Sequence, residues 1–146
     1  SGSAKQERQD YKMDFMVNRF MPYLKALQTD GRDYIICGDV NIVHKEIDIK
    51  NFTSNKKRSG CLPEERAWMD QLFDEAQYID AFREVNQEAG QYTWWSNRGQ
   101  AWANNTGWRI DYQILSEKLK GTVKAASVYK DERFSDHSPL IIDYNL

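Results

Sequence analysis

Segments with helical hydrophobic spacing alternate along this chain with short apolar runs that have the composition of strands. Between residues 8 and 27 the apolar side chains recur three or four positions apart, at Met13, Met16, Val17, Phe20, Leu24 and Leu27. This spacing predicts an amphipathic helix. Pro22 lies inside the pattern and lacks the amide hydrogen that a helix interior uses, so we expect the helix to bend or end near Met21.

A second helix is predicted after Pro63, since proline suits a first helical turn and Glu64 and Glu65 favour its positive end. Its apolar face consists of Trp68, Met69, Leu72, Phe73 and Ala76. Strands are predicted at Asp33–Cys37, Tyr92–Trp95, Trp108–Leu115, Val123–Val128 and Leu140–Tyr144. The first of these reads as a buried strand that stops at Gly38. Alternating helices and strands favour a layered α/β domain with polar residues of the strand ends lining a cleft.

The size and composition of the chain fit one soluble globular domain. It has 146 residues, of which 40% are hydrophobic and 29% charged, which excludes a disordered tail, a collagen or a coiled rod. It contains no long apolar run and no apolar N-terminal leader, so we expect a cytoplasmic protein without a membrane partner. Cys37 and Cys61 are its two cysteines, and we expect both to be reduced thiols.

The net charge of −2 means that any nucleic-acid partner must be attracted by a local patch. The segment Lys50–Arg58 carries four cations, and no acid occurs from Ile49 to Pro63. From the residues alone, this segment is either a solvated loop or a phosphate-binding loop.

Three short motifs place an acid at a strand boundary: Gly38–Asn41, Arg109–Tyr112 and Ser135–Leu140. Taken singly, each is typical of a turn, and Asp111 could simply pair with Arg109 or Arg133. If the acids converge with one histidine, however, the cost of desolvating them calls for a cation or a phosphate. A general base, an imidazole and a divalent metal such as Mg²⁺ are the parts of a phosphoester hydrolase.

The order and context of these motifs resemble the exonuclease III and abasic-site endonuclease family, within the endonuclease/exonuclease/phosphatase superfamily. The resemblance runs over residues 1–146 and matches the C-terminal half of such a protein, so the N-terminal half is expected to be absent. The residues that carry it are Gly38-Asp39-Val40-Asn41-Ile42, His44, Glu46, Ile47, Asp48, Asn51, Gly60, Pro63, Glu64, Glu65, Arg66, Tyr92-Thr93-Trp94-Trp95, Gly107-Trp108-Arg109-Ile110-Asp111-Tyr112 and Ser135-Asp136-His137.

The resemblance implies an α/β fold that is half of a four-layered DNase I-like sandwich, with one mainly antiparallel sheet and flanking helices. It implies a Mg²⁺-dependent DNA repair nuclease, with Mn²⁺ as an alternative ion. Such an enzyme cuts 5′ to abasic sites and has 3′→5′ exodeoxyribonuclease and 3′-phosphodiesterase activity. By position, Asp39 resembles the residue that activates water and Asn41 the one that bonds the scissile phosphate. His137 resembles the phosphate-contacting imidazole, Asp111 the carboxylate that orients it, and Asp136, with Asp39, a metal ligand.

The family also implies DNA-binding positions. Asn51 and Asn55 fall where relatives contact the DNA backbone, and we expect Lys56, Lys57 and Arg58 to add phosphate contacts. Trp94 and Trp108 match the wall of a pocket for a flipped-out abasic sugar, which Ile110 completes. Trp102, in the loop Ser96–Gly107, is a candidate wedge into the duplex. The expected partner is double-stranded DNA with abasic or 3′-blocked ends.

Other readings remain open at this stage. In the family a metal-binding Glu, an Asn and a Tyr lie in the N-terminal half, so we expect the isolated fragment to be inactive until that half or a second chain completes the sheet packing. The alternative is a non-catalytic DNA-binding or dimerising fragment. Inositol phosphatases and sphingomyelinases share the superfamily, but Trp94, Trp108 and the segment Lys50–Arg58 argue against them.

Overall fold

The computed structural model describes residues 2–146, with side chains from residue 4 onward; Ser1, where the family resemblance begins, lies outside the described residues. The helices are α1 (Gly2–Phe15), α2 (Met21–Leu27), α3 (Phe52–Asn55), α4 (Pro63–Asp70) and α5 (Ala81–Val85). The strands are β1 (Ile35–Asp39), β2 (Ile79–Asp80), β3 (Trp94–Trp95), β4 (Gly107–Trp108), β5 (Asp111–Leu115), β6 (Val123–Val128) and β7 (Leu140–Tyr144).

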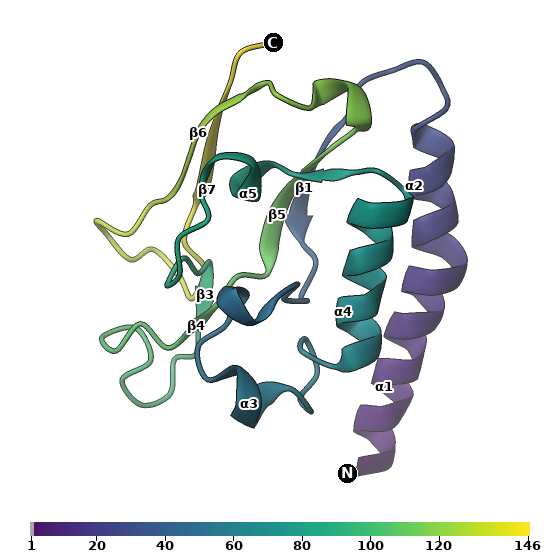
Figure 1. The fold of residues 1–146 in the computed structure, drawn as a ribbon. Coiled ribbons are helices and arrows are strands. Elements are labelled where there is room, and N and C mark those ends of the chain that lie inside the picture. Colours follow the sequence, from purple (N-terminus) through teal and green to yellow (C-terminus); the bar gives the residue numbers. More distant parts are fainter. Residues whose placement is uncertain (1) are drawn as a thin grey trace.

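The strands pair in three antiparallel sheets, with the orders β1-β5-β2, β3-β4 and β6-β7. Helices α1, α2 and α4 lie side by side on one side of the β1-β5 ladder, and β6 and β7 lie on the other (Figure 1). The register of β1 against β5 sets Asp39 directly opposite Asp111. This mixed α/β architecture with antiparallel sheets confirms the predicted fold class.

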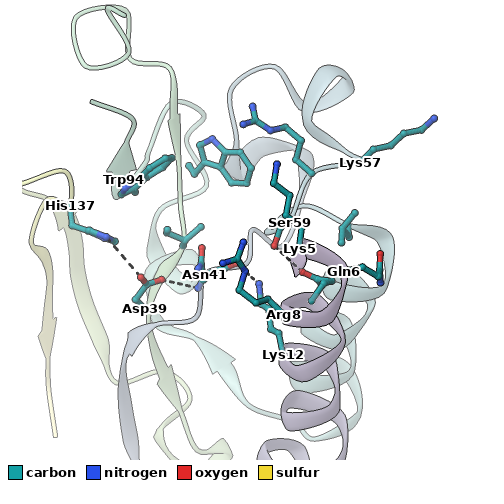
Figure 2. A pocket seen from close by; sticks show the side chains of 15 residues that line it. Lys5, Gln6, Arg8, Lys12, Asp39, Asn41, Lys57, Ser59, Trp94 and His137 are labelled. Atoms are coloured by element: carbon teal, nitrogen blue, oxygen red, sulfur yellow. Dashed lines mark hydrogen bonds and ion pairs between the residues drawn. The ribbon is translucent and has the colours of Figure 1, made fainter. Parts of the chain in front are cut away.

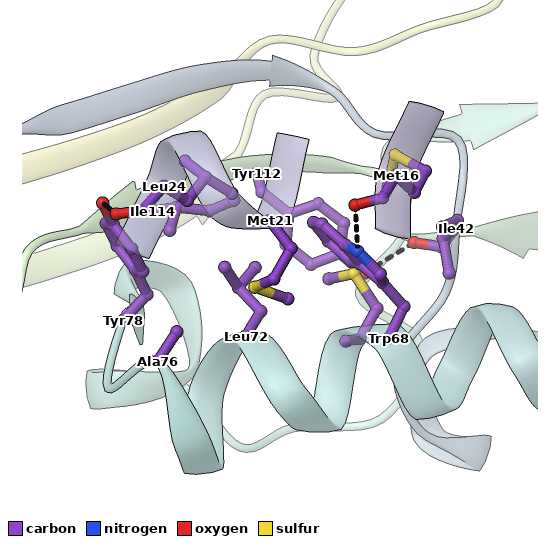
Figure 3. Packing of buried hydrophobic residues seen from close by; sticks show 11 residues of the cluster. Met16, Met21, Leu24, Ile42, Trp68, Leu72, Ala76, Tyr78, Tyr112 and Ile114 are labelled. Atoms are coloured by element: carbon purple, nitrogen blue, oxygen red, sulfur yellow. Dashed lines mark hydrogen bonds between the residues drawn. The ribbon is translucent and has the colours of Figure 1, made fainter. Parts of the chain in front are cut away.

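The main core fills the space between these helices and the sheet (Figure 3). Its aromatic side chains also hydrogen bond to backbone carbonyls across the layers. The indole of Trp68 donates to the carbonyl of Met16 at 2.8 Å, and the hydroxyl of Tyr112 donates to that of Ile42 at 2.7 Å. These polar groups are therefore satisfied while their rings add apolar contact area. The core consists of Met16, Met21, Leu24, Ile42, Trp68, Met69, Leu72, Ala76, Tyr78, Tyr112 and Ile114.

Of the two outcomes predicted near Met21, a bend or an end of the helix, the end is wrong. The backbone stays helical from α1 into α2 through a π-helical turn at Met16–Phe20, and Pro22 lies in the first turn of α2. The amide of Met21 donates to the carbonyl of Met16, five residues back. The wider turn accommodates the proline in a continuous rod. Met16 and Leu24 are buried as predicted, but Met21 is buried as well and Val17 is half exposed.

The first strand is also more exposed than its sequence suggests. β1 begins at Ile35 rather than Asp33, and its residues Ile35 and Cys37 are exposed, whereas Ile36 packs against the main core. β1 is an edge strand, and its side chains alternate between the two faces of the sheet. The predicted fully buried strand is therefore buried on one face.

The predicted strand Trp108–Leu115 is divided into β4 and β5 at Arg109 and Ile110. The amide of Arg109 donates to the carbonyl of Asp48, and that of Ile110 donates to the hydroxyl of Thr93. Both amides therefore leave the strand ladder. The strands Val123–Val128 and Leu140–Tyr144 are confirmed. No helix among residues 2–146 is long and apolar enough to span a bilayer.

Candidate active site

The cavity that holds the predicted site has a volume of about 960 Å³ and opens between α1 and the ends of β1 and β3 (Figure 2). It brings together side chains that are up to 132 residues apart along the chain, from Lys5 to His137. Its lining residues are Lys5, Gln6, Arg8, Gln9, Lys12, Asp39, Asn41, Lys57, Arg58, Ser59, Leu62, Trp94, Trp108, Ile110 and His137.

Asp39, Asp111 and His137 form the charged centre. Each offers one ligand atom, and the three atoms lie within 4.8 Å of one another. The Nδ1–H of His137 donates to Asp111 at 2.8 Å, while its Nε2 lies 3.9 Å from Asp39 Oδ2. Asp111 therefore fixes the orientation of the ring and turns Nε2 toward the cavity, where Figure 2 shows it facing Asp39.

The pKa values in this cluster follow from its geometry. Burial alone would lower the pKa of His137, but the hydrogen bond and charge of Asp111, helped by Asp39 and Asp136, raise it above the ordinary value. Burial, followed by repulsion from Asp111, raises the pKa of Asp39 despite the favourable amide of Asn41. An imidazole that keeps its proton to a higher pH than usual and a more basic carboxylate thus lie side by side.

Thr93 positions Asp111, and sequence reasoning missed it. Thr93 is fully buried, and its hydroxyl oxygen accepts the amides of Ile110 at 3.0 Å and Asp111 at 3.1 Å. The backbone at the start of β5 is therefore hydrogen bonded to Thr93, the residue that precedes β3. A threonine next to two tryptophans in an aromatic run gives no local sign of this role.

Asn41 adopts a left-handed conformation with φ of 59°, and its amide donates to Asp39 Oδ1 at 2.8 Å. Its carbonyl accepts a hydrogen bond from Lys12 of α1 at 3.0 Å. The same ammonium pairs with Glu65 of α4, which is fully buried. Glu65 also accepts the amide of Gly60 at 2.7 Å. One buried carboxylate thus joins α1, α4 and the Asn41 turn.

The predicted abasic pocket forms one wall of the cavity. The rings of Trp94 and Trp108 meet edge to face with centroids 6.2 Å apart, and Ile110 lies buried beside them. Asp136, predicted as a metal ligand, accepts the indole N–H of Trp94 at 3.1 Å. Gly60 is required here, because its φ is +95° and a Cβ would lie 3.0 Å from the Trp108 ring.

Trp102 does not present a free ring to a duplex. Its ring packs edge to face against Trp95, with centroids 4.7 Å apart. Lys130 and Arg133 lie over it at 5.1 and 5.0 Å. Insertion of Trp102 into a duplex would have to break these contacts, and its role as a wedge stays a prediction.

The predicted DNA-binding residues are not all available to a ligand. Lys57 and Arg58 line the cavity, whereas Asn51 and Lys56 are exposed outside its lining. Asn55 is buried; its amide donates to the carbonyls of Lys50 and Asn51 and accepts from Arg58. The predicted contact of Asn55 with the DNA backbone is not supported by this geometry. The side-chain amide of Asn55 is already used by the chain around α3.

Helix α1 contributes cations that sequence reasoning missed. Lys5, Arg8 and Lys12 line the cavity from one face of the helix. Their spacing of three and four residues places them on the same face, and this spacing is a signal that the sequence does contain. In Figure 2 they lie across the opening from Asp39 and His137.

Arg109 is not the partner of Asp111. It is almost fully buried and pairs with Asp48 at 2.8 Å and with Asp80 at 2.6 Å. Asp48 also pairs with Arg83 at 2.7 Å. Because Arg109 is engaged with these two acids, Asp111 is left to His137.

The donor set fits a small divalent cation. Two carboxylates and one imidazole each offer a ligand atom within 4.8 Å of the others, and the carboxylate of Asp39 is about two-fifths exposed. Mg²⁺ is commonly held by one or two carboxylates while it keeps several waters. Asp39 and Asp111 meet that requirement, whereas Asp136, whose carboxylate accepts the indole of Trp94, is not part of this group.

The chain matches the Endonuclease/Exonuclease/phosphatase family over residues 14–137. It is 39% identical over 141 residues to an exodeoxyribonuclease of Bacillus subtilis, with 96% of this chain and 55% of that protein covered. It is 36% identical over 149 residues to a DNA-(apurinic or apyrimidinic site) endonuclease of Dictyostelium discoideum, with 99% and 41% covered.

Among solved structures, a 3′-5′ exonuclease (NExo) of Neisseria meningitidis superposes with a TM-score of 0.85 at 25% identity, with 94% of this chain and 54% of that chain covered. The chain thus spans about half the length of the curated relatives it matches.

Proposed function

The chain belongs to the endonuclease/exonuclease/phosphatase family, and from this premise we propose that it carries the phosphate-binding half of a Mg²⁺-dependent DNA repair nuclease. The observation that carries the proposal is the convergence of Asp39, Asp111 and His137 within 4.8 Å at the mouth of a cavity lined by cations and tryptophans. The intact enzyme would cut 5′ to abasic sites, with 3′→5′ exodeoxyribonuclease and 3′-phosphodiesterase activity.

The proposed roles follow from the charges of the three groups. Asp39 is the general base: its raised pKa makes it a better acceptor for the proton of the attacking water. The Nε2–H of His137 donates to a non-bridging phosphoryl oxygen, and the positive ring stabilises the charge that develops there. Asp111 holds the ring in place through Nδ1. The side-chain amide of Asn41, an exposed residue, would donate a further hydrogen bond, without charge, to the phosphate.

A bound Mg²⁺ would supply neutralisation of charge on the leaving oxygen. The residues in reach to hold it are Asp39 and Asp111, with Asp136 as the further predicted ligand. Mn²⁺ suits the same oxygen donors.

The proposed partner is duplex DNA with abasic or 3′-blocked ends. Lys57, Arg58 and the cations of α1 surround the opening and would bind phosphates without reading sequence. The wall of Trp94, Trp108 and Ile110 is apolar and suits a deoxyribose that has lost its base. Unstacking costs least at such a lesion, which gives selectivity for damage.

We further propose that this chain alone does not complete the reaction, because it spans about half of its relatives. The missing half or a second chain would then close the cleft. The alternative is a non-catalytic DNA-binding or dimerising module. Such a module would not gain nuclease activity when the missing half is added. Cytoplasmic localisation stays part of the proposal.

A binding assay tests the proposed abasic-sugar pocket, and an incision assay tests the proposed need for the missing half. In EDTA, the 146-residue chain should bind a duplex with a tetrahydrofuran abasic analogue more tightly than the intact duplex. Fusing the N-terminal segment of the Bacillus subtilis relative ahead of the chain should give Mg²⁺-dependent nicking of abasic plasmid. That nicking should be about 10²–10³-fold slower in His137→Ala. Equal affinity for both duplexes would refute the pocket, and full-rate nicking by the chain alone would refute the need for completion.

A further inference from the structure

The segment between β6 and β7 carries an aromatic surface that the catalytic roles leave unused. Phe134 is 67% exposed. Its ring lies nearly parallel to that of Tyr129, with centroids 6.1 Å apart and 16° between the planes. Tyr129 thus backs one face of the Phe134 ring while most of the residue is open to solvent, and a third flat ring would extend the stack.

Two cations with several contacts lie between the two aromatic residues in the sequence. Lys130 lies over the rings of Trp95 and Trp102 at 4.9 and 5.1 Å. Arg133 lies over Trp102 at 5.0 Å and donates to the side chain of Asn97 at 3.1 Å. These contacts hold the segment between Tyr129 and Phe134 in place, so that both aromatic rings are displayed by an anchored segment.

The charge of the segment favours a ring over a phosphate. Between the two cations lie the exposed acids Asp131 and Glu132, so Tyr129–Phe134 has no net charge. A surface that recognised the DNA backbone would need a positive excess. A flat aromatic surface without net charge instead suits the face of a nucleobase, and stacking of this kind is tolerant of sequence.

The platform is continuous with the candidate active site. Arg133 Nε donates to the carbonyl of Ser135 at 3.2 Å, and the hydroxyl of Ser135 bonds to the amide and carbonyl of His137, each at 3.0 Å. Phe134 is three residues from His137, so their Cα atoms lie at most about 11 Å apart. At about 3.4 Å per stacked nucleotide, this is within about three nucleotides of the bound phosphate.

We propose that the rings of Tyr129 and Phe134 form a stacking platform for an unpaired nucleobase of the DNA strand whose phosphate lies at His137. This inference rests on the proposed function and extends it. The platform would hold a frayed or extruded base beside the lesion and add affinity for strands that carry bases, without preference for one base over another.

The test compares two single-stranded 12-mers with the same number of phosphates, one with mixed bases and one made only of tetrahydrofuran abasic units. The wild-type chain should bind the base-containing strand about tenfold more tightly, within the range that base–aromatic stacking provides. Phe134→Leu keeps an apolar side chain but loses the flat ring, and should remove this preference while leaving affinity for the baseless strand unchanged. Phe134→Trp should retain it.

The matched control is Phe15→Leu, since Phe15 is 50% exposed and stacks on Phe20 with centroids 5.6 Å apart, but belongs to α1. It should change neither affinity. The slope of affinity against salt should stay the same in Phe134→Leu, because stacking releases no counterions.

An unchanged preference in Phe134→Leu would overturn the platform. So would an equal loss of affinity for both strands, or a concentration-dependent dimer of the wild-type chain that Phe134→Leu abolishes without an effect on DNA. If the wild-type chain binds the abasic duplex but shows no base preference, the platform fails and the proposed function stands. If it binds no DNA at all, both fail.

Discussion

Protonation of Asp48 provides a quantitative test of the buried charge network. Asp48 is 1% exposed. It accepts hydrogen bonds from Arg109 at 2.8 Å, Arg83 at 2.7 Å and the amide of Lys45 at 2.9 Å. Burial alone would raise its pKa, but the charge and hydrogen bond of Arg109, with that of Arg83, lower it from 3.8 to about 2.

The sign and size of the effect follow from linkage. Because the pKa is lower in the folded state, the network stabilises the fold above pH 3.8, and this contribution is lost as the pH falls from there toward 2. A shift of almost two pKa units corresponds to about 2.5 kcal/mol in the free energy of unfolding. Solvent does not screen a group buried this deeply, so we expect the effect at this order of magnitude.

Urea unfolding followed by tryptophan fluorescence at several pH values between 2 and 5 measures this contribution. Between pH 5 and pH 2 wild type should lose about 2 kcal/mol more stability than Asp48→Asn, which cannot titrate, because at pH 2 the folded carboxyl is only half protonated. Asp74→Asn, at an exposed position, is the control and should follow wild type. Carboxyl NMR gives the titration directly. A midpoint for Asp48 near 3.8, or equal acid losses in wild type and Asp48→Asn, would refute the reasoning.

Four further outcomes are expected. Lys12→Met should lower the free energy of unfolding by about 3–5 kcal/mol, because it leaves the buried carboxylate of Glu65 without its cation; a loss below 1 kcal/mol in urea melts would contradict this. Lys57→Ala should lower the slope of log affinity against log salt by about one for any duplex. The slope of Lys57→Ala is compared with that of Lys56→Ala, since Lys56 lies outside the cavity lining. In a completed enzyme, Asp39→Asn should abolish incision while DNA affinity in EDTA is kept, and a nicking assay with residual wild-type rate would remove Asp39 as the base. His137→Ala should slow incision by about 10²–10³-fold. In the wild type, the phosphate contact of the His137 ring and its stabilising pair with Asp111 should persist above pH 6.5 and weaken as the pH rises through the raised pKa of His137. An NMR titration of the ring with a midpoint below 6.5 would contradict this pH dependence.

Much of the architecture follows from local spacing. The helical repeats after residue 8 and after Pro63, and the strands Val123–Val128 and Leu140–Tyr144, could be predicted because each depends on neighbours within a few residues. Irregular turns could not. The π-helical turn before Pro22 begins at Met16, whose carbonyl accepts the indole N–H of Trp68. Trp68 is 52 residues away, so no local pattern marks this turn.

The motifs predicted which residue types meet, and the fold decided which atoms pair. The sequence offered Asp111 two arginine partners, Arg109 and Arg133, yet it pairs with His137 because β5 and the segment before β7 meet at β3. Conversely, Asn55 matches a predicted DNA-binding position but is buried, since its amide satisfies the carbonyls of its own turn.

The amino-acid sequence by itself determined the two long helical segments, most of the strands, the family and the acids and histidine available for chemistry, because these depend on residue identity and short-range periodicity; it gave no sign of the short elements α3, α5 and β2. Only the tertiary structure decided that α1 supplies cations to the cavity, that Thr93 and Glu65 hold the site in place, and that Trp102 is pinned. Such contacts join residues tens of positions apart, and their energies arise from burial and strand register, which no local pattern encodes.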